Sequence, residues 1–157
     1  MNIRLAAACL LAACAALPAR ADRAADLRHG RYLVQISACN DCHTPGYAQQ
    51  DGHVAESEWL TGDTTGWHGP WGTTYPANLR LLLQNLDEQA WLARARAPMR
   101  PPMPAPSLRA MSDADLLAMY RYIRSLEVKG RPAPAYVPPG GRITTPYLDL
   151  TPKNLPQ

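Results

Sequence analysis

The segment Cys39-Asn40-Asp41-Cys42-His43 brings two thiols and an imidazole together within one short stretch. On a helical turn, the two-residue gap places both sulfurs on one face, where each can reach one vinyl group of a porphyrin. The imidazole of His43 follows directly and can approach the iron from the same side. The C-x-x-C-H spacing therefore predicts one haem c attached through Cys39 and Cys42, with His43 as an axial ligand.

Two other interpretations of a C-x-x-C pair fit the surrounding sequence less well. A thioredoxin-like redox pair would begin a helix after a strand, whereas here a helical pattern leads into the motif. A zinc site would need a second pair of ligands at comparable spacing, and the sequence contains none. No second C-x-x-C-H occurs, so the expected haem count is one.

A methionine in a proline-rich segment is the candidate for the sixth iron ligand. Met103 lies within Arg100–Pro104, where it is flanked by prolines that hold φ at about −65° and favour a stiff, extended path. Such a segment can cross the haem face and hold a thioether at the iron, so we expect Met103 to be the ligand. Met99 is the alternative, and ligation by His68 ranks below both. Packing roles are expected for the remaining downstream methionines, Met111 and Met119.

The N-terminal segment, residues 1–21, has the features of a cleaved signal peptide. A short positive start is followed by an apolar run over residues 5–17 and by the A-x-A site Ala19-Arg20-Ala21. Cleavage after Ala21 would export the chain to the periplasm and leave Cys39 and Cys42 as its only cysteines. A lipoprotein-like sequence ending at Cys14 is the alternative, and lipidation there would anchor the protein to a membrane.

Three segments beyond the signal peptide have a helical pattern. The first leads into the C-x-x-C-H motif and contains Gly30, which is costly in a helix unless another helix crosses closely there. The second begins near Asn85, a candidate cap, and the third begins after Ser112, which is followed by apolar residues at helical spacing. The expected helices are 25–38, 86–96 and 113–126, and the third is the expected partner of Gly30.

The rest of the chain is rich in residues that favour loops. Residues 44–84 show no sustained period and are expected to cover the haem as a loop. The aromatic residues of this segment are expected to pack on the porphyrin or donate to its propionates, with ordinary loop packing as the alternative; they are Trp59, Trp67, Trp71 and Tyr75. Residues 130–157 are rich in proline, and an irregular C-terminal arm lying on the domain is expected there. A docking segment for a partner and a partly ordered tail are the alternatives. The expected organisation is therefore a signal peptide (1–21), one haem domain (22–129) and the arm (130–157).

These residues resemble the bacterial class I cytochromes c. The similarity runs from about residue 26 to 126, with C-x-x-C-H as its most specific part. A narrower resemblance is to cytochrome domains that serve periplasmic alcohol- and aldehyde-type dehydrogenases. The segments that carry it are Gly69–Tyr75, Asn78-Leu79 and Pro102–Pro104. In such relatives a Thr-Pro-Asp segment often follows the Asn-Leu pair, whereas Arg80 and three leucines stand here. The resemblance implies an all-α fold of three main helices around the haem, with His43 and Met103 as axial ligands.

The expected function is single-electron transfer without enzymatic activity. The expected partners are redox proteins, namely a periplasmic dehydrogenase, a terminal oxidase or another cytochrome. Removing residues 1–21 takes away two arginines and no acid from 16 basic and 13 acidic residues, so the remaining chain is close to neutral. That balance argues against nucleic-acid binding. Membrane association is expected only through lipidation or docking, and the alternative function is a haem enzyme or sensor with an open sixth site.

Overall fold

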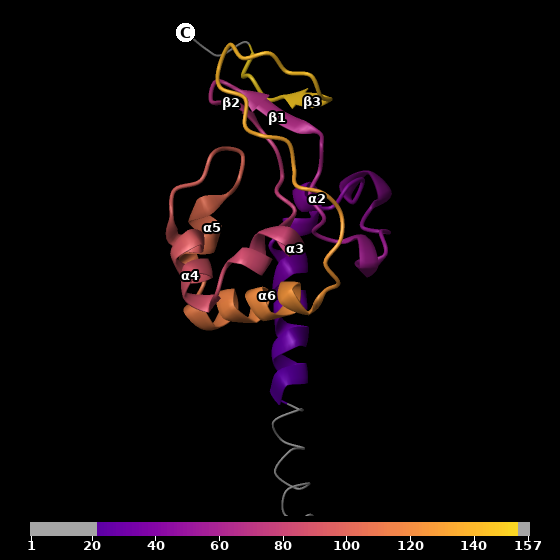
Figure 1. The fold of residues 1–157 in the computed structure, drawn as a ribbon, viewed down its shortest axis with the longest axis vertical. Helices are drawn as coiled ribbons and strands as arrows, with labels where there is room; N and C mark the ends of the chain where they lie inside the picture. The colour runs from indigo at the N-terminus through magenta and orange to yellow at the C-terminus, as the bar shows by residue number, and fades with distance from the viewer. Residues whose placement is uncertain (1–21, 154–157) are drawn as a thin grey trace, which may run out of the picture.

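The computed structural model describes residues 22–153, and helices make up most of its regular structure (Figure 1). A first helix covers residues 22–36. The later helices are α2 (Cys39–His43), α3 (Leu79–Leu82), α4 (Glu88–Arg96), α5 (Ala105–Ala110) and α6 (Asp113–Ser125). Short 3-10 turns lie at Ala48–Gln50, Glu56–Glu58 and Leu83–Asn85. The strands are β1 (Gly66–Gly69), β2 (Gly72–Thr74) and β3 (Tyr147–Asp149).

The first helix and α6 cross closely at Gly30, as the sequence predicted (Figure 1). A Cβ at Gly30 would overlap the carbonyl oxygen of Ala118 and would lie 2.8 Å from Cβ of Tyr122. The missing side chain therefore lets the two backbones approach, which offsets the cost of glycine in a helix. The crossing joins the helix that leads to the C-x-x-C-H motif to the helix that supplies many of the core residues.

Helix α6 supplies much of the core. Ser112 caps it as expected, because its Oγ accepts a hydrogen bond from the backbone N–H of Asp115 at 3.1 Å. Its buried side chains recur at helical spacing and pack with the first helix, with α4 and with the 59–60 segment. Those of α6 are Leu116, Ala118, Met119, Tyr120, Tyr122 and Ile123.

Two expected helix boundaries were wrong. The first helix ends at residue 36, and Ala38 adopts a left-handed backbone with φ of 55° before α2 begins. The motif therefore lies on its own short helix rather than at the end of a continuous one. At α4, the cap is Asp87, whose carboxylate accepts from the backbone N–H of Ala90 at 2.8 Å, and not Asn85. Asn85 instead belongs to the 3-10 turn that precedes α4.

A small sheet departs from the expected all-α fold. Strand β1 pairs with β2 in antiparallel register and with β3 in parallel register, in the order β2-β1-β3. Strands of three or four residues are too short to show an alternation of apolar and polar residues, and β3 lies far from β1 in sequence. The pairing was therefore invisible in the residue pattern, and the segment expected to be loop contains two strands and helix α3.

The C-terminal arm is irregular for most of its length, as expected, but it is anchored along the domain. It contributes β3 and an isolated bridge between Val137 and Thr73. No helix within residues 22–153 is long and apolar enough to cross a membrane. The predicted signal peptide, with Cys14, lies outside the described residues.

Candidate haem-binding site

The two cysteines of the motif lie on α2 with free, half-buried thiols. Burial raises the pKa of Cys39 to about 12, and burial also raises the pKa of Cys42, with a further contribution from the nearby Asp41 carboxylate. This environment disfavours a charged thiolate. An uncharged thioether carries no such penalty, so both positions fit covalent attachment to a porphyrin vinyl group.

The imidazole of His43 is buried and has one nitrogen already in use. Its Nδ1 lies 2.7 Å from the backbone carbonyl oxygen of Ala77. A carbonyl can only accept, so Nδ1 carries the proton and Nε2 keeps its lone pair for a metal. Burial lowers the pKa of His43, which favours the neutral ring that ligates iron.

A set of backbone and side-chain hydrogen bonds holds α2 against the 60–62 segment. The carbonyl of His43 accepts from the N–H of Gly62 at 2.8 Å. Thr44 donates its hydroxyl to Oδ1 of Asn40 at 2.8 Å and accepts from the N–H of Leu60 at 2.7 Å. Leu79 in turn donates to the carbonyl of Leu60 at 3.0 Å. The segment that bears Ala77 is thus tied to the motif.

Arg80 is a further residue of this support, and sequence reasoning noted it only as a departure from the family pattern. Its side chain is 1% exposed. Its Nε donates to the carbonyl of Trp59 at 2.7 Å, Nη1 donates to that of Glu127 at 2.8 Å and Nη2 donates to that of Glu56 at 2.8 Å. One guanidinium therefore joins α3 to the segment before Leu60 and to the chain after α6. The sequence did offer one sign of this role, because a charged residue next to a run of leucines is a candidate for a buried, hydrogen-bonded side chain.

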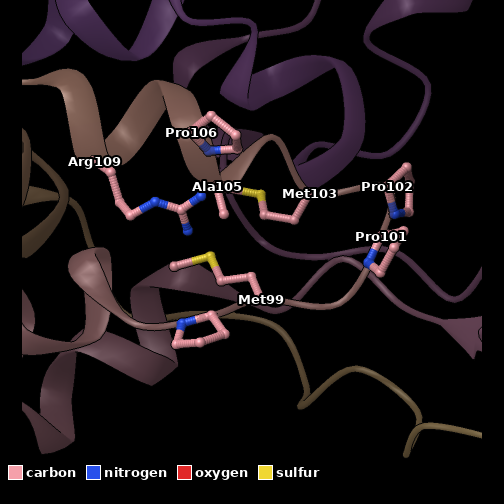
Figure 2. Close-up of a pocket in the computed structure, with 8 residues that line it drawn as sticks. Met99, Pro101, Pro102, Met103, Ala105, Pro106 and Arg109 are labelled. Atoms are coloured by element: carbon pink, nitrogen blue, oxygen red, sulfur yellow. The ribbon is translucent and has the colours of Figure 1, made fainter.

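The two candidate methionine ligands lie together in one pocket of about 340 Å³ (Figure 2). Met99 and Met103 are both half-buried, and both their sulfurs are drawn facing the same space, into which Arg109 also extends. The chain turns at Pro101 and Pro102, so the expectation of an extended path there was wrong. The segment 97–104, called here the methionine strap, reaches the sheet because Thr74 donates its hydroxyl to the carbonyl of Pro101 at 2.7 Å.

The other candidate ligands lie elsewhere. Met119 is 2% exposed in the core, and Met111 packs against that core from its edge. The ring of His68 lies in the sheet, where its Nδ1 is 2.9 Å from Oγ1 of Thr73 and its ring makes a T-shaped contact with that of Tyr147. These contacts agree with the packing roles expected for the two methionines.

The aromatic residues of the 44–84 segment differ in their hydrogen bonding. Trp59 donates its indole N–H to the carbonyl of Val54 at 2.8 Å, and the hydroxyl of Tyr75 bonds to that of Thr145 at 2.7 Å. Within the described residues, the buried indole Nε1 of Trp71 has no partner, and neither has Nδ2 of Asn40. Buried donors are normally satisfied, so these two indicate a polar group that the polypeptide does not itself supply. The carboxylates of a haem are such groups, and the residues present fit that cofactor.

Comparison with known proteins agrees with this geometry. The sequence model of the cytochrome c family matches residues 28–127, which include the motif, the methionine strap and α6. Members of this family bind haem c covalently, and the spacing of Cys39 and Cys42 with His43 next to them matches that attachment. No curated protein and no solved structure gives a significant match. The family match spans most of the chain, and the protein belongs to the cytochrome c family, whose haem serves electron transfer.

Proposed function

We propose that this protein is an exported electron carrier whose single haem c is attached at Cys39 and Cys42 and ligated by His43 and Met103. The observation that carries the proposal is the buried His43 ring, with Nδ1 donating to Ala77 and Nε2 left for the iron. The bound haem supplies an iron that alternates between the ferrous and ferric states.

The polypeptide contributes orientation and burial. The hydrogen bond from His43 to Ala77 holds the imidazole plane and its tautomer, so the ligand does not turn between redox states. The neighbouring bonds of Thr44 and Gly62 hold the backbone that carries the ring. A fixed ligand keeps reorganisation small, and a buried site with a thioether ligand favours the ferrous state and raises the reduction potential.

Met103 is assigned as the sixth ligand because its backbone is held more closely than that of Met99. Its carbonyl accepts from the N–H of Ala105 at 2.8 Å, directly at the start of α5. Pro102 and Pro104 flank it, so few backbone conformations are lost when the sulfur binds. Met99 lies in the preceding coil and remains the competing ligand to be tested.

The periplasm is the proposed location, and a dehydrogenase is the proposed electron donor. Support for the location comes from the signal-peptide features of residues 1–21. Support for the donor comes from the resemblance of Gly69–Tyr75 and Pro102–Pro104 to the cytochromes of such enzymes. The protein would then pass single electrons to the respiratory chain, through a terminal oxidase or another cytochrome.

The ferrous absorption spectrum with and without carbon monoxide tests this function. A site closed by histidine and methionine should give no shift at neutral pH, because neither ligand leaves readily. Acid-acetone extraction should leave the red chromophore on the polypeptide if both thioethers are present. Rapid carbon monoxide binding by the native protein would instead support a haem enzyme or sensor, and loss of all colour on extraction would contradict covalent attachment.

A further inference from the structure

The C-terminal arm, residues 130–153, lies outside the part of the chain that matches the cytochrome c family. It nevertheless contacts both sides of the candidate site. Near its start, Nδ2 of Asn78 donates to the carbonyls of Lys129 at 2.8 Å and of Arg131 at 3.4 Å. Asn78 follows Ala77, the residue whose carbonyl holds His43. The arm therefore begins beside the histidine side of the site.

Further along, Tyr136 contacts the methionine strap. The guanidinium carbon of Arg100 lies 4.0 Å from the centroid of the Tyr136 ring, close enough for a cation–π interaction. Arg100 precedes Met103 by three residues. The hydroxyl of Tyr136 donates to the carbonyl of Trp71 at 2.6 Å, so the same side chain joins the strap to the turn between β1 and β2.

The position of Tyr136 is fixed by the neighbouring backbone. Val137 exchanges two hydrogen bonds with the buried Thr73, at 2.7 and 3.0 Å. Beyond it, the N–H of Gly66 donates to the carbonyl of Pro146 at 2.8 Å, and β3 then pairs with β1. The Tyr136 ring is therefore carried by a segment that bonds to the sheet directly after it and to Asn78 before it.

Met99 and Met103 pack against the edge of the core, but the strap has few hydrogen bonds to the rest of the fold. Its residues 97–104 form no helix or strand, and its one hydrogen bond to the sheet in the described structure runs from Thr74 to Pro101. Segments with few buried and hydrogen-bonded groups open locally at low free-energy cost. A contact that joins the strap to the sheet therefore makes local opening of the strap more costly, and it slows the departure of a strap residue from its place.

We propose that the arm clamps the methionine strap through Tyr136, a positioning residue that keeps Met103 at the haem iron. Tyr136 does so by holding Arg100 with its ring and Trp71 with its hydroxyl. The inference rests on the proposed ligation by Met103. It assigns to the arm a role in ligand retention that the family match does not cover, and it predicts that weakening the Arg100–Tyr136 contact loosens the ligand without removing the haem.

The test is the rate of cyanide binding to the ferric holoprotein at saturating cyanide, where release of the native ligand limits the reaction. The near-infrared sulfur-to-iron absorption band reports the fraction with methionine bound. Tyr136→Ala should speed binding by about twofold to thirtyfold, the range equivalent to a cation–π contact. Tyr136→Phe keeps the ring and should have a smaller effect. Arg100→Gln should resemble Tyr136→Ala, and the double variant should be no faster than the faster single one.

Matched controls are Tyr32→Ala and Arg28→Gln, because both residues are exposed and lie on the first helix, which is not connected to the strap. Neither should change the rate. If Tyr136→Ala fails to accumulate as holoprotein, Arg100→Gln decides, since Arg100 is an exposed residue. Unchanged rates in Arg100→Gln or Tyr136→Ala, with the band present in the parent, overturn the clamp alone. Absence of the band in the parent overturns methionine ligation, and the clamp with it.

Discussion

The imidazole of His43 illustrates how much of the site is decided by single atoms. Its place in the motif makes it a ligand candidate, but the partner of Nδ1 determines which nitrogen is available. That partner is the carbonyl of Ala77, which lies outside the motif and on a segment braced by Leu79 and Arg80. The local geometry of this candidate ligand thus depends on residues around position 80.

Met103 and Met99 can be distinguished by substitution. Met103→Ala should open the sixth coordination position, so the ferrous protein should bind carbon monoxide and its reduction potential should fall, because thioether ligation favours the ferrous state. Met99→Ala is the matched control, since it removes the neighbouring thioether of the same pocket. Absorption spectra with carbon monoxide and a redox titration measure both effects. The reverse result would assign the ligand to Met99.

Arg80 should contribute more to stability than an arginine usually does. Arg80→Met removes the donor from three backbone carbonyls at once, and buried acceptors left without a donor are costly. We expect the free energy of unfolding to fall by roughly 3 kcal/mol, and Arg80→Lys to recover only part of it, since an ammonium lacks the planar fork. Denaturant unfolding of the holoprotein measures this.

The control for Arg80 is Arg94→Met, at an exposed position of α4. It should change stability by no more than about 0.5 kcal/mol. Similar losses at both positions would mean that the three carbonyl contacts of Arg80 add nothing beyond an ordinary surface arginine. If Arg80→Lys recovers part of the lost stability, the recovered part is due to the positive charge and the rest is due to the geometry of the guanidinium.

At the scale of elements, the crossing of the first helix with α6 decides where the motif lies. Both helices were predicted from the sequence, α6 from its apolar spacing, and Gly30 indicated their point of contact. The break at residues 37–38 was not predicted, because Ala38 is not a residue whose type indicates a positive φ. A local bend of this kind depends on the packing of the segments on either side of it.

Gly30→Ala should destabilise the protein by about 1–3 kcal/mol, because the new Cβ would overlap the Ala118 carbonyl and the helices would have to separate. In an isolated helix the same change would be favourable, so the sign of the effect tests the crossing. Thermal or denaturant unfolding measures it. Arg28→Ala, at an exposed position of the same helix, is the control and should have little effect. A stabilised Gly30→Ala protein would contradict the close approach.

At the scale of the whole molecule, the family domain and the arm form one connected structure. The expected boundary at residue 129 matches a change in composition, since the proline-rich segment begins there. In the structure, however, the arm adds β3 to the sheet and bonds to the loops on both sides of the site. Treating residues 130–153 as a separate tail would miss these contacts.

The intact mass of the purified protein tests the predicted processing and cofactor together. We expect a chain that begins at Asp22 and carries the added mass of one haem, because cleavage after Ala21 leaves one C-x-x-C-H motif. A variant with Cys39→Ser and Cys42→Ser should lose the added mass. Cys14→Ser should leave the mature mass unchanged, because cleavage after Ala21 removes that position. An acylated chain beginning at Cys14 would establish the lipoprotein alternative instead.

The sequence by itself determined the attachment chemistry, the haem count, the methionine candidates and the helix pair that meets at Gly30. These follow from local spacing, since thioether attachment needs only two thiols and a histidine in order, and a helix shows its period within a few turns. Tertiary structure alone decided that Ala77 holds His43, that Arg80 binds three carbonyls and that Tyr136 contacts the strap. Backbone carbonyls are the same in every residue, so which one meets a given side chain depends on how distant segments pack, and no residue pattern records it.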